Sequence, residues 1–374
     1  MKKLQNKHLI ILSHATRSIA LSFTSVYIPI FLLSRGFTLS QVIGYFALYH
    51  FSGLIFTLIL FPVFFSRLGL VRTIQSYFLI ETAYLLLLNY FVGDVSIWWF
   101  AVLGGIANMV YWIPKNILFL NHADLQTMGS DLGWFMGLPK LAGVVGPLVS
   151  ALIVTNFGFT PIFIISAIGL MIPGIILSRL TEIERGVTVN LKKGFKRLWE
   201  ERGIFTLECF DNIIEESEWY WPIFVFITLG ALELPGIVGA ITSIAGFLFA
   251  ITVGKIVNAH QGQVLNAGIV SLVAISLIRV AAPATEWLYL SLSFVAAFAS
   301  TAFLAAYFAG IYRKVKSTGE KNTEFMIVRE VPTIIARLTV FGVLLLVTSG
   351  KEFYLLPIVA LFVLLGLMRR VKVS

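Results

Sequence analysis

Long apolar segments recur along the whole chain and are separated by short polar connections. An α-helix of about 20 apolar residues is long enough to cross the hydrocarbon core of a bilayer. Helices satisfy their own backbone hydrogen bonds, so this pattern favours membrane-spanning helices over any other structure. The predicted spans are residues 8–33, 40–65, 70–92, 95–120, 129–155, 159–179, 204–230, 234–257, 263–282, 285–311, 323–348 and 352–369.

One long polar connection falls in the middle of the chain, at residues 180–203. It divides the predicted spans into two equal sets. We therefore expect a first six-helix half at 1–179, a basic cytoplasmic linker at 180–203 and a second six-helix half at 204–374. Part of the linker can form an amphipathic helix that lies along the membrane surface. Its expected apolar face consists of Val187, Leu191, Phe195 and Leu198.

The basic residues in the connections and at the ends of the spans are concentrated on alternate connections. They are Lys2, Lys3, Lys7, Arg67, Arg72, Arg179, Arg185, Lys192, Lys193, Lys196, Arg197, Arg202, Lys255, Arg313, Lys314, Lys316, Lys321, Arg369, Arg370 and Lys372. The other connections hold only Arg35 and Lys351. Since cytoplasmic loops carry the excess of Lys and Arg, both termini are predicted to lie in the cytoplasm.

Composition supports a membrane protein and excludes several other classes. Hydrophobic residues make up 58% of the chain and charged residues 13%, whereas soluble domains average about a quarter charged. The net charge of +9 is explained by the cytoplasmic connections, so no nucleic-acid partner is expected. The single cysteine, Cys209, allows no internal disulfide. Nucleotide-binding, hydrolase and metal-ligand patterns are missing from the sequence, so we expect neither an enzyme nor a cofactor or metal.

The two predicted halves share an internal sequence repeat. The stretch "YIPIFLL" at 27–33 matches "YWPIFVF" at 220–226, at an offset of 193 residues. Further pairs at the same offset are Pro139 with Pro332, and Gly69 with Gly262. A repeat of this kind predicts two parallel six-helix units around a central site, which is a transporter architecture. Pro332 is also expected to kink its helix.

These features resemble the major facilitator superfamily over nearly the whole chain. The resemblance implies an all-α polytopic membrane protein, in which twelve transmembrane helices form two parallel six-helix repeats. It also implies a central cavity lined by helices 1, 4, 7 and 10. The stretch "PVFFSRLGLVR" keeps Arg67 and Gly69 of the family's Gly-x-x-x-Asp-Arg-x-Gly pattern but replaces its Gly and Asp. "AGVVGPLVSA" is similar to a motif of family antiporters and gives a slight lean towards export. Close packing of small residues between helices explains the same letters.

Charged residues inside the predicted spans point to a functional site. Each would cost about 2.5–3.5 kcal/mol at the bilayer centre if it faced lipid, so these residues must face the bundle interior. The buried bases are Arg17, Lys115, Lys140, Arg279, Arg329 and Arg337. The buried acids are Glu81, Glu208, Asp211, Glu215, Glu216, Glu218 and Glu330.

An acidic stripe runs along the first helix of the second half. At about 100° per residue, one arc of roughly 80° holds four acids, while Glu216 points about a quarter-turn away. The four are Glu208, Asp211, Glu215 and Glu218. Subtracting 193 maps the last three onto Ser18, Ser22 and Ser25. Helices 1 and 7 therefore carry polar faces in the same register, which predicts a cavity between them.

We assign the candidate residues to three roles. The expected substrate-binding residues are Arg17, Ser18, Ser22, Lys115, Asn116, Lys140 and Tyr220. Proton coupling is expected at Asp211, Glu215, Glu218 and Glu330, with Glu215 or Glu218 as the first choice, because clustered carboxylates can share a proton near neutral pH. The expected charge partners are Glu81, Arg279, Arg329 and Arg337. A static Lys115–Glu81 pair is the structural alternative for Lys115.

The sequence predicts a secondary active transporter that moves a small polar or zwitterionic solute by alternating access, with proton coupling. The expected partners are the solute, protons and the lipid bilayer, and the expected form is a monomer. The expected location is the plasma (inner) membrane of a prokaryote. Two alternatives stay open: a lipid or amphiphile flippase on the same fold, and a non-transporting membrane sensor or scaffold.

Overall fold

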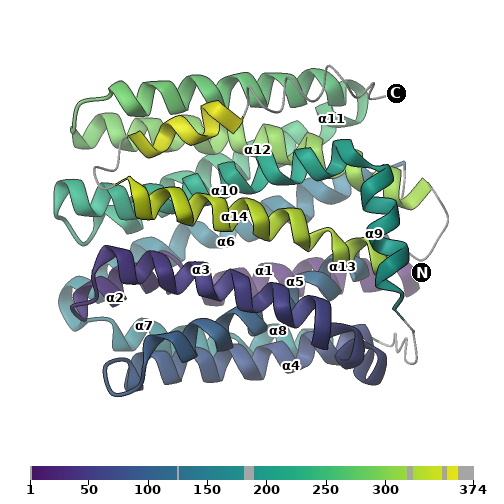
Figure 1. Cartoon of the computed structure of the whole chain (residues 1–374), viewed down its shortest axis with the longest axis horizontal. Coiled ribbons are helices and arrows are strands. Elements are labelled where there is room, and N and C mark those ends of the chain that lie inside the picture. The colour runs from purple at the N-terminus through teal and green to yellow at the C-terminus, as the bar shows by residue number, and fades with distance from the viewer. Residues whose placement is uncertain (1, 124–125, 181–188, 318–322, 348–351, 361–374) are drawn as a thin grey trace.

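A computed structural model describes residues 2–123, 126–180, 189–317, 323–347 and 352–360. Long helices lie side by side in one bundle, and the described residues contain no strand (Figure 1). Before the linker the elements are α1 (Lys2–Ser22), α2 (Tyr27–Ser34), α3 (Leu39–Ile55), the π-helical turn η1 (Phe56–Leu60), α4 (Phe61–Phe91), α5 (Ile97–His122), α6 (Met128–Phe157), α7 (Thr160–Gly169) and α8 (Met171–Leu177). From the linker onward they are α9 (Leu191–Glu200), α10 (Arg202–Leu229), α11 (Leu234–Ala281), α12 (Glu286–Ser317), α13 (Thr323–Val328), α14 (Glu330–Leu346) and the 3₁₀ turn η2 (Glu352–Tyr354).

The helical backbone breaks inside α4 and inside α11, and the chain makes one pass before and one pass after each break. In α4 the backbone leaves helical geometry at Gly69 (φ 76°, ψ 173°), a conformation that glycine adopts readily. In α11 the change occurs at His260 (φ −132°, ψ 40°). The expected kink at Pro332 is also present: α13 ends at Val328 and α14 begins at Glu330. Proline cannot donate to the carbonyl four residues earlier, here that of Val328.

Eight helical stretches in the described residues are long and apolar enough to cross a membrane. One of them, Leu39–Phe91, contains the break at Gly69 and therefore makes two passes. α10 and α13–α14 are absent from these eight stretches. Both carry several charged side chains within a span length, which is the feature that made them candidates for the functional site. The last predicted span, 352–369, lies partly outside the described residues.

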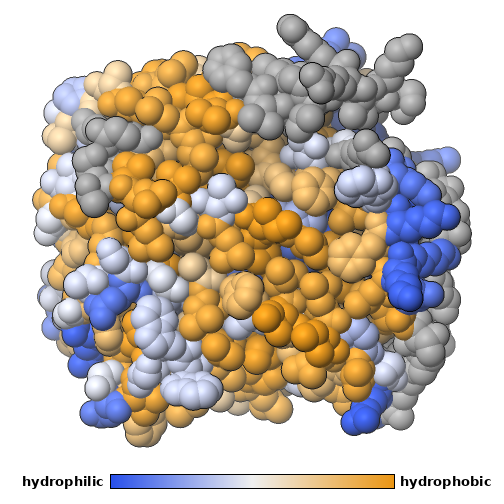
Figure 2. Space-filling view, viewed as in Figure 1, coloured by the Kyte–Doolittle hydropathy of each residue, from blue (hydrophilic) through white to orange (hydrophobic). Residues whose placement is uncertain are grey.

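The outer surface of the bundle is apolar around its middle. Figure 2 shows hydrophobic residues across the centre of the visible face, with hydrophilic residues gathered towards the two ends. Large side chains exposed on the bundle include Leu79, Trp99, Leu152, Phe157 and Ile168. A surface of this kind suits lipid rather than water. The protein is therefore a multi-pass membrane protein.

The linker carries an amphipathic helix, α9. Asn190 caps it by accepting from the Lys193 backbone N–H at 3.3 Å. Gly194 packs against the Glu324 carbonyl of α13, and Leu198 is buried beside it. Phe195 is exposed, so it does not share the buried face as expected. Val187, from the same expected face, lies outside the described residues.

We call α1–α8 the first bundle and α10–α14 the second bundle. Close contacts between small residues join the two bundles. α6 packs along α11, and α3 packs along α14. A Cβ added at Gly143 would lie 2.7 Å from the Ser243 hydroxyl, and one at Gly239 would lie 3.1 Å from the Pro147 ring. This arrangement supports the packing interpretation of "AGVVGPLVSA".

Candidate functional site

A cavity of about 310 Å³ lies between the two bundles. α1, α5, α10 and α12, which are the first, fourth, seventh and tenth spans, all line this main cavity, together with α6, α14 and Arg329 just before α14. Its polar lining consists of His14, Arg17, Ser18, Asn108, Lys115, Asn116, Lys140, Glu208, Asp211, Asn212, Glu215, Tyr312, Arg329, Glu330, Thr333 and Arg337. Most of the sequence-predicted site residues therefore meet in one space.

The first bundle supplies a wall of cations. Arg17 donates from Nε to the Tyr77 hydroxyl at 2.7 Å, and its guanidinium lies 3.9 Å from the centre of the Tyr111 ring. Lys115 is buried, with Nζ 3.6 Å from the centre of the Trp112 ring. Aromatic faces attract such cations without neutralising them. Within the described part of the chain, neither residue has a carboxylate within 4 Å, and the same holds for Lys140.

Glu81 does not pair with these cations. Its side chain is buried in α4 but lines neither of the two cavities described here. The alternative Lys115–Glu81 pair does not form, because the Lys115 ammonium is directed at the rings of Trp112 and Phe135. The expected role of Glu81 as a direct charge partner is therefore not supported by contact geometry.

The second bundle supplies a wall of carboxylates, some paired and some not. Glu208 forms an ion pair with Arg329 and accepts a hydrogen bond from the Thr333 hydroxyl at 3.4 Å. Asp211 and Glu330 are both buried, and no Lys or Arg nitrogen of the described residues lies within 4 Å of either carboxylate. The Asp211 Oδ1 atom also has no hydrogen-bond donor. Unpaired buried carboxylates are costly, so they are functional candidates.

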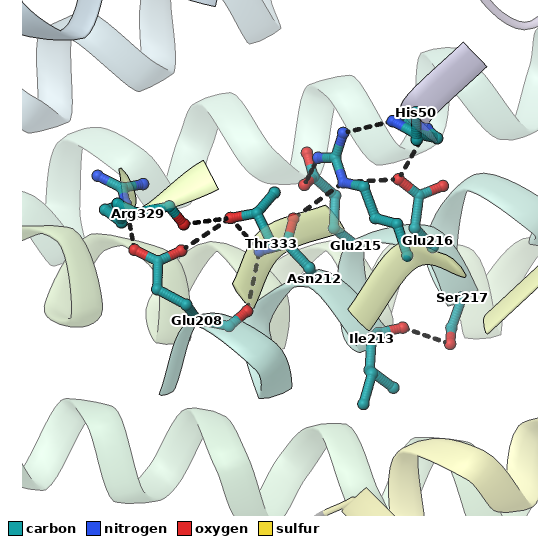
Figure 3. A network of polar contacts seen from close by, with 10 residues as sticks. His50, Glu208, Asn212, Ile213, Glu215, Glu216, Ser217, Arg329 and Thr333 are labelled. Atoms are coloured by element: carbon teal, nitrogen blue, oxygen red, sulfur yellow. Dashed lines mark hydrogen bonds and ion pairs between the residues drawn. The ribbon is translucent and has the colours of Figure 1, made fainter. Parts of the chain in front are cut away.

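Arg337 organises a polar network that reaches across the interface between the bundles (Figure 3). It donates from Nη2 to Glu215 at 2.6 Å, and its Nε lies 3.0 Å from oxygens of both Asn212 and Glu216. On the far side its Nη1 lies 3.3 Å from Nδ1 of His50, on α3. Arginine only donates, so Nδ1 of His50 is the acceptor and its Nε2–H faces Glu216, 3.6 Å away. Glu216 is predicted from the sequence to point away from the acidic stripe. In the structure its carboxylate faces His50 of α3.

A second cavity of about 270 Å³ adjoins the main one and shares Lys140 and Glu215 with it. Glu218 lines this second cavity, where both of its oxygens accept from Arg279, at 2.6 and 2.9 Å. The repeat is visible in this arrangement. Ser18 and its equivalent Asp211 line the main cavity, whereas Ser25 and its equivalent Glu218 line the second.

Four predicted residues lie outside both cavities: Ser22, Glu81, Tyr220 and Arg279. Ser22 packs directly against Gly146 of α6, so helix packing takes its side chain out of the polar stripe. Tyr220 packs 5.3 Å, centre to centre, from the ring of Phe353. Ser22 and Tyr220 lie outside the cavities for the same reason. The rotation of a helix about its axis, and so the direction of each side chain, depends on the helices that pack against it.

Several lining residues were not among the sequence candidates. They include Asn108, Asn212 and Thr333. Asn212 follows Asp211 directly, and Thr333 stands one helical turn after Arg329, so helical spacing from the charged residues provides a signal for both. His14 lines the cavity as well, and its Nδ1 atom is hydrogen-bonded to the Tyr111 hydroxyl at 2.8 Å.

Comparison with known proteins places this arrangement in a known fold. No sequence-family profile and no curated protein matches the chain. A solved structure of a major facilitator superfamily transporter, FucP, in the outward conformation matches with a TM-score of 0.74 and 13% identity, over 99% of both chains. A bacterial homologue of the iron transporter ferroportin, in its outward-facing state, matches with a TM-score of 0.71 and 12% identity, over 96% of this chain and 97% of that one.

The chain has the major facilitator fold. The same ferroportin homologue with soaked iron matches with a TM-score of 0.66 and 12% identity, over 96% of both chains. The predicted class, an all-α polytopic membrane protein with this fold, is therefore confirmed. The similar structures are those of transporters or of a transporter homologue, rather than of enzymes. At 12–13% identity this likeness concerns the fold, and the solute has to be inferred from the cavity itself.

Proposed function

We propose that this protein is a secondary active transporter of a small zwitterionic or polar solute. One observation carries the proposal: a single cavity between the bundles has unpaired cations on one wall and unpaired carboxylates on the other. Arg17 and Lys115 come from the first bundle, and Asp211 and Glu330 from the second. A zwitterion supplies a carboxylate to the first wall and an ammonium group to the second. A static scaffold would have its buried charges paired, so the unpaired ones favour a ligand.

Alternating access follows from the position of the cavity. Contacts between the bundles occur on both sides of it. On one side the Tyr27 hydroxyl donates to the Leu232 carbonyl at 3.4 Å, and on the other the rings of Phe119 and Tyr312 lie 5.9 Å apart. Rocking of one bundle against the other would break these contacts in turn and expose the cavity first to one side of the membrane and then to the other.

We assign the proton-coupling role to Asp211 and Glu330 ahead of Glu215 and Glu218. Glu218 is held by two hydrogen bonds from Arg279, and Glu215 by one from Arg337. Asp211 and Glu330 can exchange a proton without breaking an ion pair. They also face the cavity, where protonation would change the charge that the solute meets.

The cavity favours a small polar solute over two other classes. A bare metal cation would meet the unpaired charges of Arg17, Lys115 and Lys140. A lipid would have to place its acyl chains near charged groups on both walls, at a cost of several kcal/mol for each charge that it strips of its solvent. The volume of about 310 Å³ is at the lower end for ligand pockets, which suits a metabolite of modest size.

The proposed topology places both termini in the cytoplasm of a prokaryotic cell, with the protein acting as a monomer in the plasma (inner) membrane. Residues 1–179 and 204–374 would be the two moving units, and 180–203 the tether between them. The basic residues of the tether, such as the exposed Lys192 and Lys196, would face the anionic cytoplasmic leaflet.

The first test is a thermal-shift screen of the purified protein with free amino acids, betaines, organic anions and organic cations. We expect amino acids or betaines to stabilise it, and uptake of the strongest stabiliser into proteoliposomes. Lys115→Met and Asp211→Asn should each lower uptake at least tenfold. Lys192→Met removes an exposed lysine outside the cavity and serves as the control. The site assignment fails if both cavity variants transport as well as the control.

Proton coupling is tested in the same vesicles. An imposed pH gradient should drive accumulation of the radiolabelled stabiliser, and a protonophore should abolish it. Asp211→Asn or Glu330→Gln should remove pH-driven accumulation, and the transport that remains should be exchange of labelled for unlabelled solute, because exchange needs no net proton movement. Unchanged pH-driven accumulation in both variants would refute the assignment. The direction of accumulation relative to the gradient distinguishes export from import.

A further inference from the structure

We propose that the second cavity is a second binding subsite for the same small zwitterion, occupied as the solute passes between the main cavity and one end of the bundle. This inference rests on the proposed function. It goes beyond it by assigning a separate site, with its own residues, to a separate stage of transport.

The two cavities follow one another along the bundle axis. α10 contributes Asp211 to the main cavity and Glu218 to the second, a step of seven residues or about 10 Å of helix. α12 runs in the opposite direction and shows the reverse order, with Leu304, Phe308 and Tyr312 in the main cavity and Ala297 and Ser300 in the second. The first span agrees with this order, because Ser18 of α1 lines the main cavity and Ser25, in the turn after α1, lines the second.

Lys140 and Glu215 stand at the boundary between the cavities, because both line each of them. Lys140 comes from the first bundle and Glu215 from the second. Lys140 has no carboxylate within 4 Å among the described residues. A solute carboxylate that leaves Arg17 and Lys115 would meet Lys140 next, so its charge stays compensated along the route.

The second cavity also has a cation and carboxylates, although both of its carboxylates are held by arginines. Lys140 is its cation, and Glu215 and Glu218 are its carboxylates. Glu218 is neutralised by Arg279, but its side chain remains 23% exposed. Trp219 also lines this cavity, and an aromatic ring can attract an ammonium group. The cavity therefore has a place for each charged end of a zwitterion.

Next to the second cavity, the two bundles contact one another at Tyr27. The Tyr27 hydroxyl reaches the Leu232 carbonyl at 3.4 Å. A Cβ added at Gly236 would lie 2.6 Å from the Tyr27 hydroxyl, so the backbones are close there. A solute in the second cavity would be held until this contact parts. At about 270 Å³ the second cavity is nearly as large as the main one, so both can hold a small solute at once.

The test counts bound solute molecules. Equilibrium dialysis of the purified protein uses the free amino acid or betaine that gives the largest thermal shift, as a radiolabelled probe. We expect saturation at about two molecules per chain, one for each pocket. Thr242→Leu, which fills the second cavity, should reduce this to about one. Thr252→Leu makes the same change on the same helix at an exposed position and should leave the number unchanged.

Ser25→Leu fills the second cavity from the opposite wall. It provides an independent test if Thr242→Leu does not fold. Saturation at one molecule in the wild type overturns the inference, as does an unchanged number in both filled variants. Failure of the proposed function looks different: no zwitterion binds at all, or binding survives in Lys115→Met with no loss of either molecule.

Discussion

The polar network at His50 yields a prediction about which conformation the protein prefers. His50 lies on α3 in the first bundle and contacts Arg337 and Glu216 of the second, at 3.3 and 3.6 Å. The change His50→Phe removes both contacts but keeps an aromatic ring in place, stacked 5.6 Å from Phe341. Arg337 retains its carboxylate partners on α10, so the variant leaves no buried charge without a partner.

The size of the effect follows from these contacts. A hydrogen bond to a charged group contributes about 1.5–3 kcal/mol. Both distances are long, so we take this range for the pair together rather than for each contact. The protein can adopt one state in which α3 packs against α14 and another in which these helices are apart. Since 1.4 kcal/mol corresponds to a factor of ten, the population ratio of the first state to the second should fall about 10- to 150-fold.

Spin-label distance measurements detect this shift without any solute. Labels at Ser40 on α3 and Leu346 on α14, both exposed and at the same end of the bundle, report the separation of the two helices in a Cys209→Ser background. His50→Phe should move the distribution to longer distances. His14→Phe is the matched control, because the buried His14 bonds to Tyr111 within its own bundle.

An unchanged distribution in His50→Phe would refute the reasoning, and so would an equal shift in the His14→Phe control. Either result would mean that the network does not hold the bundles together. The apolar contacts around it would then set the conformational equilibrium. The ring pair of Phe46 and Trp219, whose centres lie 4.5 Å apart, is the leading alternative.

Two further predictions concern stability, measured as the midpoint of unfolding in detergent. Glu208→Gln should destabilise the protein by about 3–5 kcal/mol, because its partner Arg329 is left buried without a counter-charge. Asp211→Asn should change the free energy of unfolding little, since it removes a charge that has no partner. Equal losses in these two variants would show that the pairing in the structure does not govern stability. Gly105→Ala should cost about 1–3 kcal/mol because its methyl group would overlap a backbone carbonyl of α3, whereas Gly342→Ala enters open space and should gain up to about 1 kcal/mol. A neutral Gly105→Ala would contradict the close packing of α3 on α5.

The sequence by itself determined the helical membrane class, and its spans and internal repeat carried the resemblance to the major facilitator fold. These properties follow from local quantities: the length of each apolar run is set by bilayer thickness, and the repeat at an offset of 193 residues is written in the letters. It also indicated which charged residues face away from lipid, because a charged side chain inside a membrane span is costly unless it faces the bundle interior. The axial register of Ser18 with Asp211 followed from the same repeat.

Only the tertiary structure decided how those charges are paired and which of them face the cavity. Arg337 bonds to Glu215 across 122 residues of sequence, and Arg279 bonds to Glu218 across 61. Ser22 leaves the polar stripe because Gly146 of another helix lies against it. A helix sequence specifies a face but not its partner. Which side chains meet depends on how helices rotate and kink when they pack, and that is settled by contacts between residues far apart in the chain.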